Sequence, residues 1–243
     1  MDIKGSTALV TGANRGLGAT FCHALLDRGA VKVYAGARDP ATVATEGAVP
    51  VRLDVTSDAD VAAVAERCSD VTLLVNNAGI TTGTAALADD ALEMARREFG
   101  TNVLGPLAMS RALAPALGAN GGGAIINVLS VLSWFSMAGT AIYCASKAAS
   151  WSLTNSLRQE LFPQGTQVLA LHVGFMDTDM AAGIDAPKSS PDDVAAQALD
   201  GIDAGAYEVL ADDVSRNVRA ALSAELTALY PALATTTAAL HRV

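Results

Sequence analysis

Tyr143 and Lys147 lie four residues apart in the segment IYCASKAA, which occupies positions 142–149. Side chains at this spacing share one face of a helix, so the phenol and the ammonium group are neighbours. A phenol can donate a proton, and a nearby ammonium group stabilises the phenolate and lowers the phenol's pKa. The same spacing occurs by chance in many helices. The pair alone therefore indicates either an acid–base site or an ordinary helix face.

A glycine-rich segment, TGANRGLG, occupies positions 11–18 and directly follows the apolar run 7–10. Glycines permit a tight turn and let backbone N–H groups approach a pyrophosphate, whose charge a helix N-terminus also favours. The alternative is a tight turn without a ligand. At the first strand-to-helix turn of a βαβ pattern, the segment favours dinucleotide binding. The expected contacts are Gly12, Asn14, Arg15, Gly16, Leu17 and Gly18.

The end of the second expected strand indicates which dinucleotide binds. NAD-selective sites usually carry Asp or Glu there, which binds the ribose 2′-OH. This sequence has Ala37 followed by Arg38, and a guanidinium group can pair with a 2′-phosphate. Arg15 offers a second cation. Both arginines could instead be merely solvated, and Asp39 could contact a ribose, but the pattern favours NADP(H) over NAD(H).

Alternating strands and helices must position these residues. Short apolar runs typical of buried strands lie between helical stretches, which predicts parallel strands joined by right-handed crossovers. We expect an α/β Rossmann fold with a doubly wound, seven-stranded parallel sheet and helices on both faces. The strands are expected at 7–10, 32–37, 49–53, 71–75, 124–129, 167–172 and 207–211, and the helices at 19–28, 58–68, 88–117 and 141–161.

Nothing in the sequence divides the 243 residues, because no linker, repeat or low-complexity segment is present. We therefore expect a single domain over 1–243. An alanine-rich, helical stretch is expected from Val214 onward, with a loose tail over 231–243.

Composition restricts the classes of partner. The net charge is −9 and no basic run occurs, which argues against nucleic acid or an anionic membrane surface. No stretch is apolar enough to span a bilayer, and the N-terminus lacks the pattern of a signal peptide. Three cysteines without C-x-x-C spacing argue against a disulfide framework or a zinc site. We expect no metal and a cytoplasmic location.

Taken together, the motifs resemble the short-chain dehydrogenase/reductase family, specifically its single-domain, NADP-preferring, carbonyl-reductase-like members. The resemblance covers about residues 5–212. It rests on motifs that follow one another in order: TGANRGLG at 11–18, LDV at 53–55, NNAG at 76–79, Asn102, Ser130 and the Tyr143/Lys147 pair.

The resemblance implies an oxidoreductase that interconverts a ketone or aldehyde and an alcohol with NADP(H). Tyr143 would act as general acid and base, and Lys147 would tune it and bind the nicotinamide ribose. Ser130 would polarise the carbonyl oxygen, with Ser133 as the weaker alternative for that role. Asn102 would hold a water molecule in a proton relay. The same fold also occurs in proteins that bind NADP(H) as a sensor or scaffold without turnover, which often lack the tyrosine or the lysine.

The resemblance also implies cofactor contacts at the ends of later strands. The motif NNAG could be a simple strand-ending turn. His172 is expected to be structural, and Val173 replaces the proline usual in the family, which restores a backbone N–H. The further cofactor contacts are expected at Asp54, Val55, Asn76, Ala78, Gly79, Gly174 and Thr178.

The substrate and the partners are the least constrained features. Bulky apolar residues at 131–137, together with Phe175, Met176 and Met180, predict a pocket for a hydrophobic carbonyl or alcohol. Trp134 and Phe135 could equally form an oligomer contact. The short segment 181–191 predicts an open site that tolerates varied substrates. The resemblance implies a homodimer or homotetramer assembled through the helices at 88–117 and 141–161.

Overall fold

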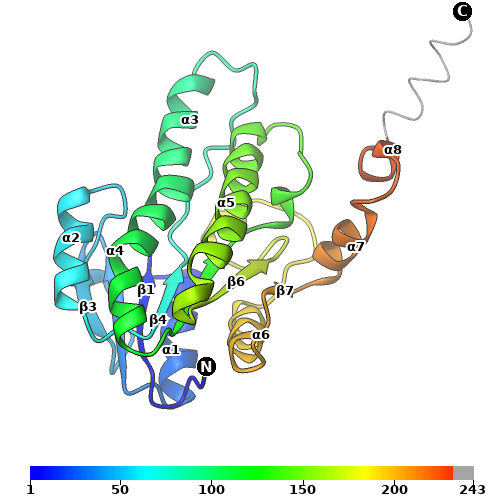
Figure 1. Cartoon of the computed structure of the whole chain (residues 1–243). Coiled ribbons are helices and arrows are strands. Elements are labelled where there is room, and N and C mark those ends of the chain that lie inside the picture. The colour runs from blue at the N-terminus through cyan, green and yellow to red at the C-terminus, as the bar shows by residue number, and fades with distance from the viewer. Residues whose placement is uncertain (232–243) are drawn as a thin grey trace, which may run out of the picture.

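Seven parallel strands form the centre of the protein, whose structure is a computed structural model that describes residues 1–231 (Figure 1). The expected tail over 231–243 therefore lies almost entirely outside the described residues. The strand order is β3-β2-β1-β4-β5-β6-β7, which confirms the doubly wound sheet. The strands are β1 (Thr7–Thr11), β2 (Lys32–Ala37), β3 (Val49–Arg52), β4 (Leu73–Asn76), β5 (Ala124–Val128), β6 (Gln167–His172) and β7 (Glu208–Leu210).

Helices cover both faces of the sheet and bury the apolar side chains of the strands. One core contains side chains of α1 (Gly16–Asp27) and α6 (Pro191–Asp203). The opposite core contains side chains of α2 (Asp58–Arg67), α4 (Gly105–Ala119) and α5 (Ala141–Glu160). The central strands are apolar on both faces because both faces are covered. Helix α6 is missing from our sequence-based expectation.

Two further helices follow β7, namely α7 (Asp213–Ala221) and α8 (Leu226–Leu229). They extend to one side of the sheet (Figure 1). Single 3-10 turns occupy Pro40–Thr42, Val131–Ser133, Phe162–Gln164 and Asp179–Ala181. Within residues 1–231, every helix is too short or too polar to cross a membrane.

The helix expected over 88–117 is two helices in one rod. Helix α3 (Ala91–Phe99) passes into a π-helical turn at Gly100–Leu104 before α4 begins. In that turn the N–H of Gly105 donates to the carbonyl of Gly100, five residues earlier. The rod lies beside α5 (Figure 1). A π turn inserts a residue into the helix and is frequent at functional sites.

The strand order reverses between β1 and β4, because β2 and β3 lie on one side of β1 and the later strands on the other. At such a switch point the two loops that leave the carboxyl ends of the strands diverge and open a crevice. The glycine-rich turn follows β1 and the NNAG motif ends β4. The topology therefore brings these two motifs together.

Candidate active site

The glycine-rich turn is shaped by contacts that exclude larger residues. Gly12 has a φ of +63°. A Cβ on Gly18 would lie 2.1 Å from the carbonyl oxygen of Gly12 and 2.6 Å from Nδ2 of Asn77. The N–H groups at the start of α1 lack partners within the helix and are available to a phosphate. The turn therefore fits a dinucleotide pyrophosphate.

The neighbouring side chains of the turn have different surroundings. Leu17 is buried in the core, so only its backbone is available to a ligand. Arg15 is exposed and pairs with Asp179, with Nη1 3.0 Å from Oδ2. A Cβ on Gly16 would lie 3.5 Å from Cγ2 of Thr178. The structure thus brings the expected nicotinamide residue Thr178 directly against the phosphate turn.

Arg38 and Asp39 follow β2 and have different roles. Arg38 is exposed, and within residues 1–231 its side chain forms no ion pair. Oδ1 of Asp39 accepts a hydrogen bond from the N–H of Ala41 at 3.0 Å and caps the following 3-10 turn. The carboxylate of Asp39 is therefore engaged locally, which favours Arg38 as the group that faces an adenosine ribose.

Asp54 and Val55 follow β3 at the same edge of the sheet. The hydroxyl and the N–H of Thr56 both donate to Oδ1 of Asp54, and these bonds lower the pKa of its carboxyl group. Val55 is buried against Gly105 at the start of α4, where a Cβ would lie 2.8 Å from Cγ2 of Val55. These contacts fix the loop that we expect to face the adenine ring.

The NNAG motif divides its two asparagines between two tasks. Nδ2 of Asn76 donates to Oδ1 of Asn127 at 2.8 Å and to Ser110 at 3.2 Å, so this side chain links β4 to β5 and α4. Nδ2 of Asn77 donates to the carbonyls of Thr11 and Gly12. The residue that holds the glycine turn is therefore Asn77, which our sequence reasoning did not select, whereas Asn76 is placed inside the sheet.

Ser130 and Ser133 form one small motif after β5. Oγ of Ser130 accepts from the N–H of Leu132 at 3.1 Å, and Oγ of Ser133 accepts from the N–H of Ser130 at 3.4 Å. The two serines make a capping box around the 3-10 turn. Ser133 is thereby tied to the backbone, and Ser130 is the serine whose hydroxyl interacts with Tyr143.

Tyr143 and Lys147 lie on the first turns of α5 as expected. Nζ of Lys147 is 5.7 Å from the centre of the Tyr143 ring and donates to the carbonyl of Val128 at 2.8 Å. Burial raises the pKa of Tyr143 above its ordinary range, and hydrogen bonding with Ser130 acts in the opposite direction. Burial also lowers the pKa of Lys147 to about 8. Burial therefore outweighs the groups that lower the pKa of Tyr143.

Asn102 lies within the π turn and clamps the loop after β4. Its Oδ1 accepts from the N–H of Ile80 at 2.9 Å, and its Nδ2 donates to the carbonyl of Ile80 and to Oγ of Ser146. Its own carbonyl accepts from Oγ of Ser150 at 2.6 Å. Asn102 thus connects the loop to α5, the helix that carries Tyr143.

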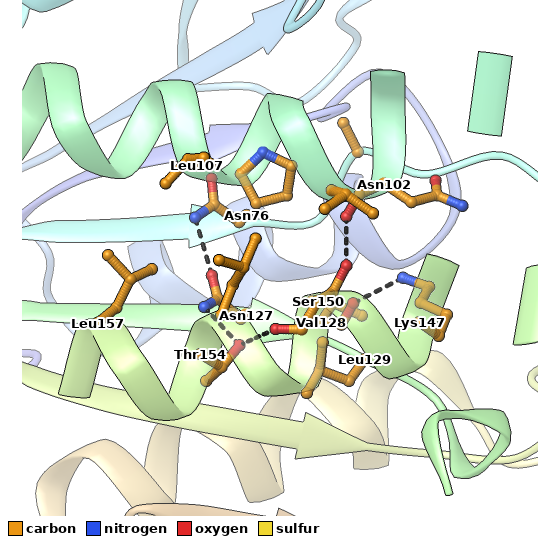
Figure 2. A pocket seen from close by; sticks show the side chains of 14 residues that line it. Asn76, Asn102, Leu107, Asn127, Val128, Leu129, Lys147, Ser150, Thr154 and Leu157 are labelled. Carbon is orange, nitrogen blue, oxygen red and sulfur yellow. Dashed lines mark hydrogen bonds between the residues drawn. The ribbon is translucent and has the colours of Figure 1, made fainter. Parts of the chain in front are cut away.

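A row of polar side chains continues from Asn102 into the sheet (Figure 2). Ser150, Thr154 and Asn127 lie in succession, and Nδ2 of Asn127 donates to Oγ1 of Thr154 at 2.9 Å. The row lines a small cavity that Lys147 enters from one end and Asn76 from the other (Figure 2). A Cβ on Gly79 would lie 3.4 Å from Oδ1 of Asn102 and 3.7 Å from Nζ of Lys147.

The end of β6 and the residues that follow it contact the 3-10 turn after β5. His172 is fully buried, contacts the carbonyl of Ser130 through Nδ1 at 3.2 Å, and stacks on Trp134 with ring centres 3.8 Å apart. This agrees with a structural role for His172. The carbonyl of Val173 accepts from the N–H of Val131 at 3.0 Å. The N–H of Gly174 donates to Asp212.

Two features of the site escape sequence reasoning. Glu98 reads as part of a charged helical stretch, yet its side chain is fully buried. Trp134, which we expected to form a pocket or an oligomer contact, is half-buried, and its ring stacks on the buried His172. Among residues 1–231, no three His, Cys, Asp or Glu side chains are grouped so that they could hold a metal ion.

Comparisons with known proteins agree with this geometry. The sequence profile of the short chain dehydrogenase family matches residues 6–189. A short chain dehydrogenase from Burkholderia cenocepacia, solved in complex with NADP, is 40% identical with a TM-score of 0.91, and the match covers 96% of this chain and 99% of that one. A sorbitol dehydrogenase from Cereibacter sphaeroides is 37% identical over 76% of each chain. A 3-oxoacyl-[acyl-carrier-protein] reductase from Vibrio harveyi is 31% identical, with 84% of this chain and 85% of that protein covered. The chain therefore belongs to the short chain dehydrogenase family.

Proposed function

We propose that this protein is an NADP(H)-dependent oxidoreductase that interconverts a ketone or aldehyde and an alcohol, with the whole chain forming one catalytic domain. The observation that carries the proposal is the convergence of Ser130, Tyr143 and Lys147 beside a turn that fits a pyrophosphate. Ser130 offers a hydroxyl just after β5, and α5 carries the phenol of Tyr143 and, one turn later, the ammonium group of Lys147.

The proton chemistry follows from the surroundings of these side chains. When bound, the nicotinamide supplies the hydride to the carbonyl carbon or accepts it in the reverse direction. Ser130 donates a hydrogen bond to the carbonyl oxygen as negative charge develops there. Tyr143 gives that oxygen its proton, and the raised pKa of the phenol ensures that it is protonated when substrate arrives. Lys147, as ammonium, stabilises the phenolate that remains.

Several side chains of the crevice would hold the cofactor. The first turn of α1 and the glycine turn bind the pyrophosphate, Asp54 and Val55 flank the adenine, and Thr178 and Gly174 lie at the nicotinamide end. Arg38 binds the 2′-phosphate, because it is exposed and unpaired within the described residues while Asp39 is occupied by Ala41. The NADP complex of the Burkholderia cenocepacia relative supports NADP over NAD.

An apolar cluster surrounds the phenol and supports a hydrophobic substrate. Val131, Leu132 and Cys144 are buried there, and Phe135 and Met137 pack against them together with Tyr143. The named activities of the relatives concern a sugar alcohol in one case and a carrier-bound oxoacyl group in another. A substrate panel should therefore contain both classes beside simple hydrophobic ketones and aldehydes.

We expect the α3–α4 rod to form a contact between subunits of a homo-oligomer, and we expect the protein to be cytoplasmic. Leu92 on α3 is 75% exposed and Leu104 in the π turn is 59% exposed. Leu92 and Leu104 lie twelve residues apart along the rod, and we expect a second subunit to cover both. Three buried, free cysteines, Cys22, Cys68 and Cys144, suit a reducing compartment.

The test is nicotinamide absorbance with NADPH or NADH against this panel, measured for the wild type and Tyr143→Phe. We expect NADPH-dependent turnover by the wild type, and loss of turnover without loss of NADPH binding in the variant. Turnover that survives in Tyr143→Phe would exclude the tyrosine as proton donor. NADPH binding without turnover on any carbonyl or alcohol would favour a sensor or scaffold.

A further inference from the structure

Glu98 is a fully buried carboxylate on the face of α3 that packs toward α5. Its Oε1 accepts hydrogen bonds from both the N–H and the hydroxyl of Thr82. Its Oε2 is buried and has no hydrogen-bond partner among residues 1–231. A buried acidic group without full pairing is costly, so its retention calls for an explanation beyond packing.

The contacts of Glu98 lead directly to the residue before Tyr143. The hydroxyl of Thr82 lies 2.8 Å from the hydroxyl of Thr84, and the carbonyl of Thr84 accepts from the N–H of Ile142 at 3.4 Å. Ile142 belongs to the first turn of α5. Glu98 therefore connects α3, through the loop after β4, to the helical turn that carries the proposed proton donor.

Glu98 and Asn102 clamp the same loop from consecutive turns of the rod. Asn102 binds both backbone groups of Ile80, and Glu98 binds Thr82 two residues later. Asn102 thereby holds the part of the loop beside Lys147, and Glu98 holds the part beside Tyr143. The two clamps differ in one respect, because only Glu98 brings a charge into this interior.

The charge acts on both members of the pair in the same direction. Burial raises the pKa of Tyr143 and lowers that of Lys147 to about 8, and the negative charge of Glu98 raises the pKa of both. The other ionisable neighbours are Cys144, which also raises the pKa of Tyr143, and His172 on β6, which is kept neutral by its own burial. Glu98 is thus the counter-charge that opposes the loss of the lysine's proton.

We propose that Glu98 is a positioning residue of the active site, which fixes the first turn of α5 through Thr82 and Thr84 and whose buried charge acts on Tyr143 and Lys147. The consequence for turnover rests on the proposed oxidoreductase function. The effect on Lys147 does not, because it is a property of the protein without cofactor or substrate.

A titration of the lysines tests the electrostatic part directly. The chain contains four lysines, Lys4, Lys32, Lys147 and Lys188, so lysine labelled with ¹³C at Cε gives few NMR signals, and Lys147→Arg identifies one of them. We expect a wild-type midpoint near 8 for Lys147 in the cofactor-free protein. In Glu98→Gln the Lys147 midpoint should fall by about one pH unit, because the variant removes a negative charge from the protein interior.

Glu93→Gln is the matched control, because Glu93 lies on the same helix and is exposed, so it loses the same charge without changing the interior. Its Lys147 midpoint should equal that of the wild type. Equal midpoints in Glu98→Gln and the wild type would overturn the electrostatic part of the proposal, whatever the enzyme does.

A turnover assay tests the role of Glu98 independently of the lysine titration. Carbonyl reduction requires protonated Tyr143 and Lys147. The alkaline limb of the plot of reduction rate against pH should therefore lie at lower pH in Glu98→Gln than in Glu93→Gln. Thr82→Val keeps the charge and the backbone hydrogen bond to Glu98 but removes the hydroxyl that links Glu98 to Thr84. It should reduce kcat several-fold while leaving the Lys147 midpoint unchanged, and an unchanged kcat would overturn the positioning part. A wild type without turnover would refute the proposed function and leave the lysine titration as the deciding result.

Discussion

Replacing Gly18 with alanine gives opposite predictions from helix propensity and from packing. Gly18 lies in the first turns of α1, and alanine is preferred over glycine inside a helix by about 1 kcal/mol. A Cβ at this position would nevertheless lie 2.1 Å from the carbonyl oxygen of Gly12 and 2.6 Å from the amide nitrogen of Asn77. Gly12 is part of the turn and the Asn77 amide holds it through the carbonyls of Thr11 and Gly12, so neither can move aside without changing the turn.

The size of the effect follows from what must move. Overpacking of this kind costs about 1–3 kcal/mol, and weakening the hydrogen bonds from Asn77 to Thr11 and Gly12 costs about 1 kcal/mol more. For a chain of this length, a loss of about 2–4 kcal/mol lowers the Tm by roughly 5–15 °C. The displaced turn should also bind NADPH at least about tenfold more weakly, or 1.4 kcal/mol.

Thermal unfolding and NADPH fluorescence titration measure the two effects. Gly183→Ala is a suitable control, because a Cβ on Gly183 would meet no atom within 4 Å and its φ is not positive. That variant should keep the wild-type Tm and NADPH affinity. A Gly18→Ala protein with a raised Tm and unchanged NADPH affinity would refute the packing argument and show that helix propensity dominates at this position.

Three further predictions concern other parts of the molecule. Arg38→Asp should weaken NADPH binding and shift cofactor preference toward NADH, and an unchanged preference in the nicotinamide assay would assign the 2′-phosphate to Arg15. Asp179→Asn removes the partner that pairs with Arg15 at 3.0 Å; because both side chains are exposed, unfolding stability should change by less than about 1 kcal/mol in a urea titration. Burial lowers the pKa of His172 to about 4, so between pH 6.5 and 4 the unfolded chain binds a proton that the native protein does not. The free energy of unfolding should therefore decrease as the pH falls from 6.5 to 4. His172→Gln should flatten this dependence, measured by urea titrations at several pH values.

The sequence predicts the architecture well because buried parallel strands have a strong local signature. The runs around Leu9, Leu74 and Ile125 are apolar on both faces, and the structure buries these side chains completely. Helix α6 was not expected, although Pro191 stands at its first position and two acidic residues follow it. The family and the doubly wound sheet are confirmed, whereas the roles of the site residues remain predictions.

Local pattern is less informative where a side chain's direction decides its role. Asn76 and Asn77 are adjacent and identical, but Asn76 ends β4 and bonds within the sheet, whereas Asn77 begins the following loop and bonds to the glycine turn. Glu98 follows two arginines on α3, a pattern typical of a solvated face. Its burial results from the packing of α3 against α5, which no spacing within α3 reveals.

The π turn at Gly100–Leu104 has a consequence for the phase of the long rod. Each residue advances an α-helix by about 100°, so the additional residue in this turn rotates α4 about its axis relative to α3. Deleting one residue here would leave every side chain of α4 intact but turn Met109 and Leu113, which are fully buried, away from the sheet. The number of residues in this turn therefore determines whether Asn102 can face the loop after β4 while Met109 and Leu113 face the sheet.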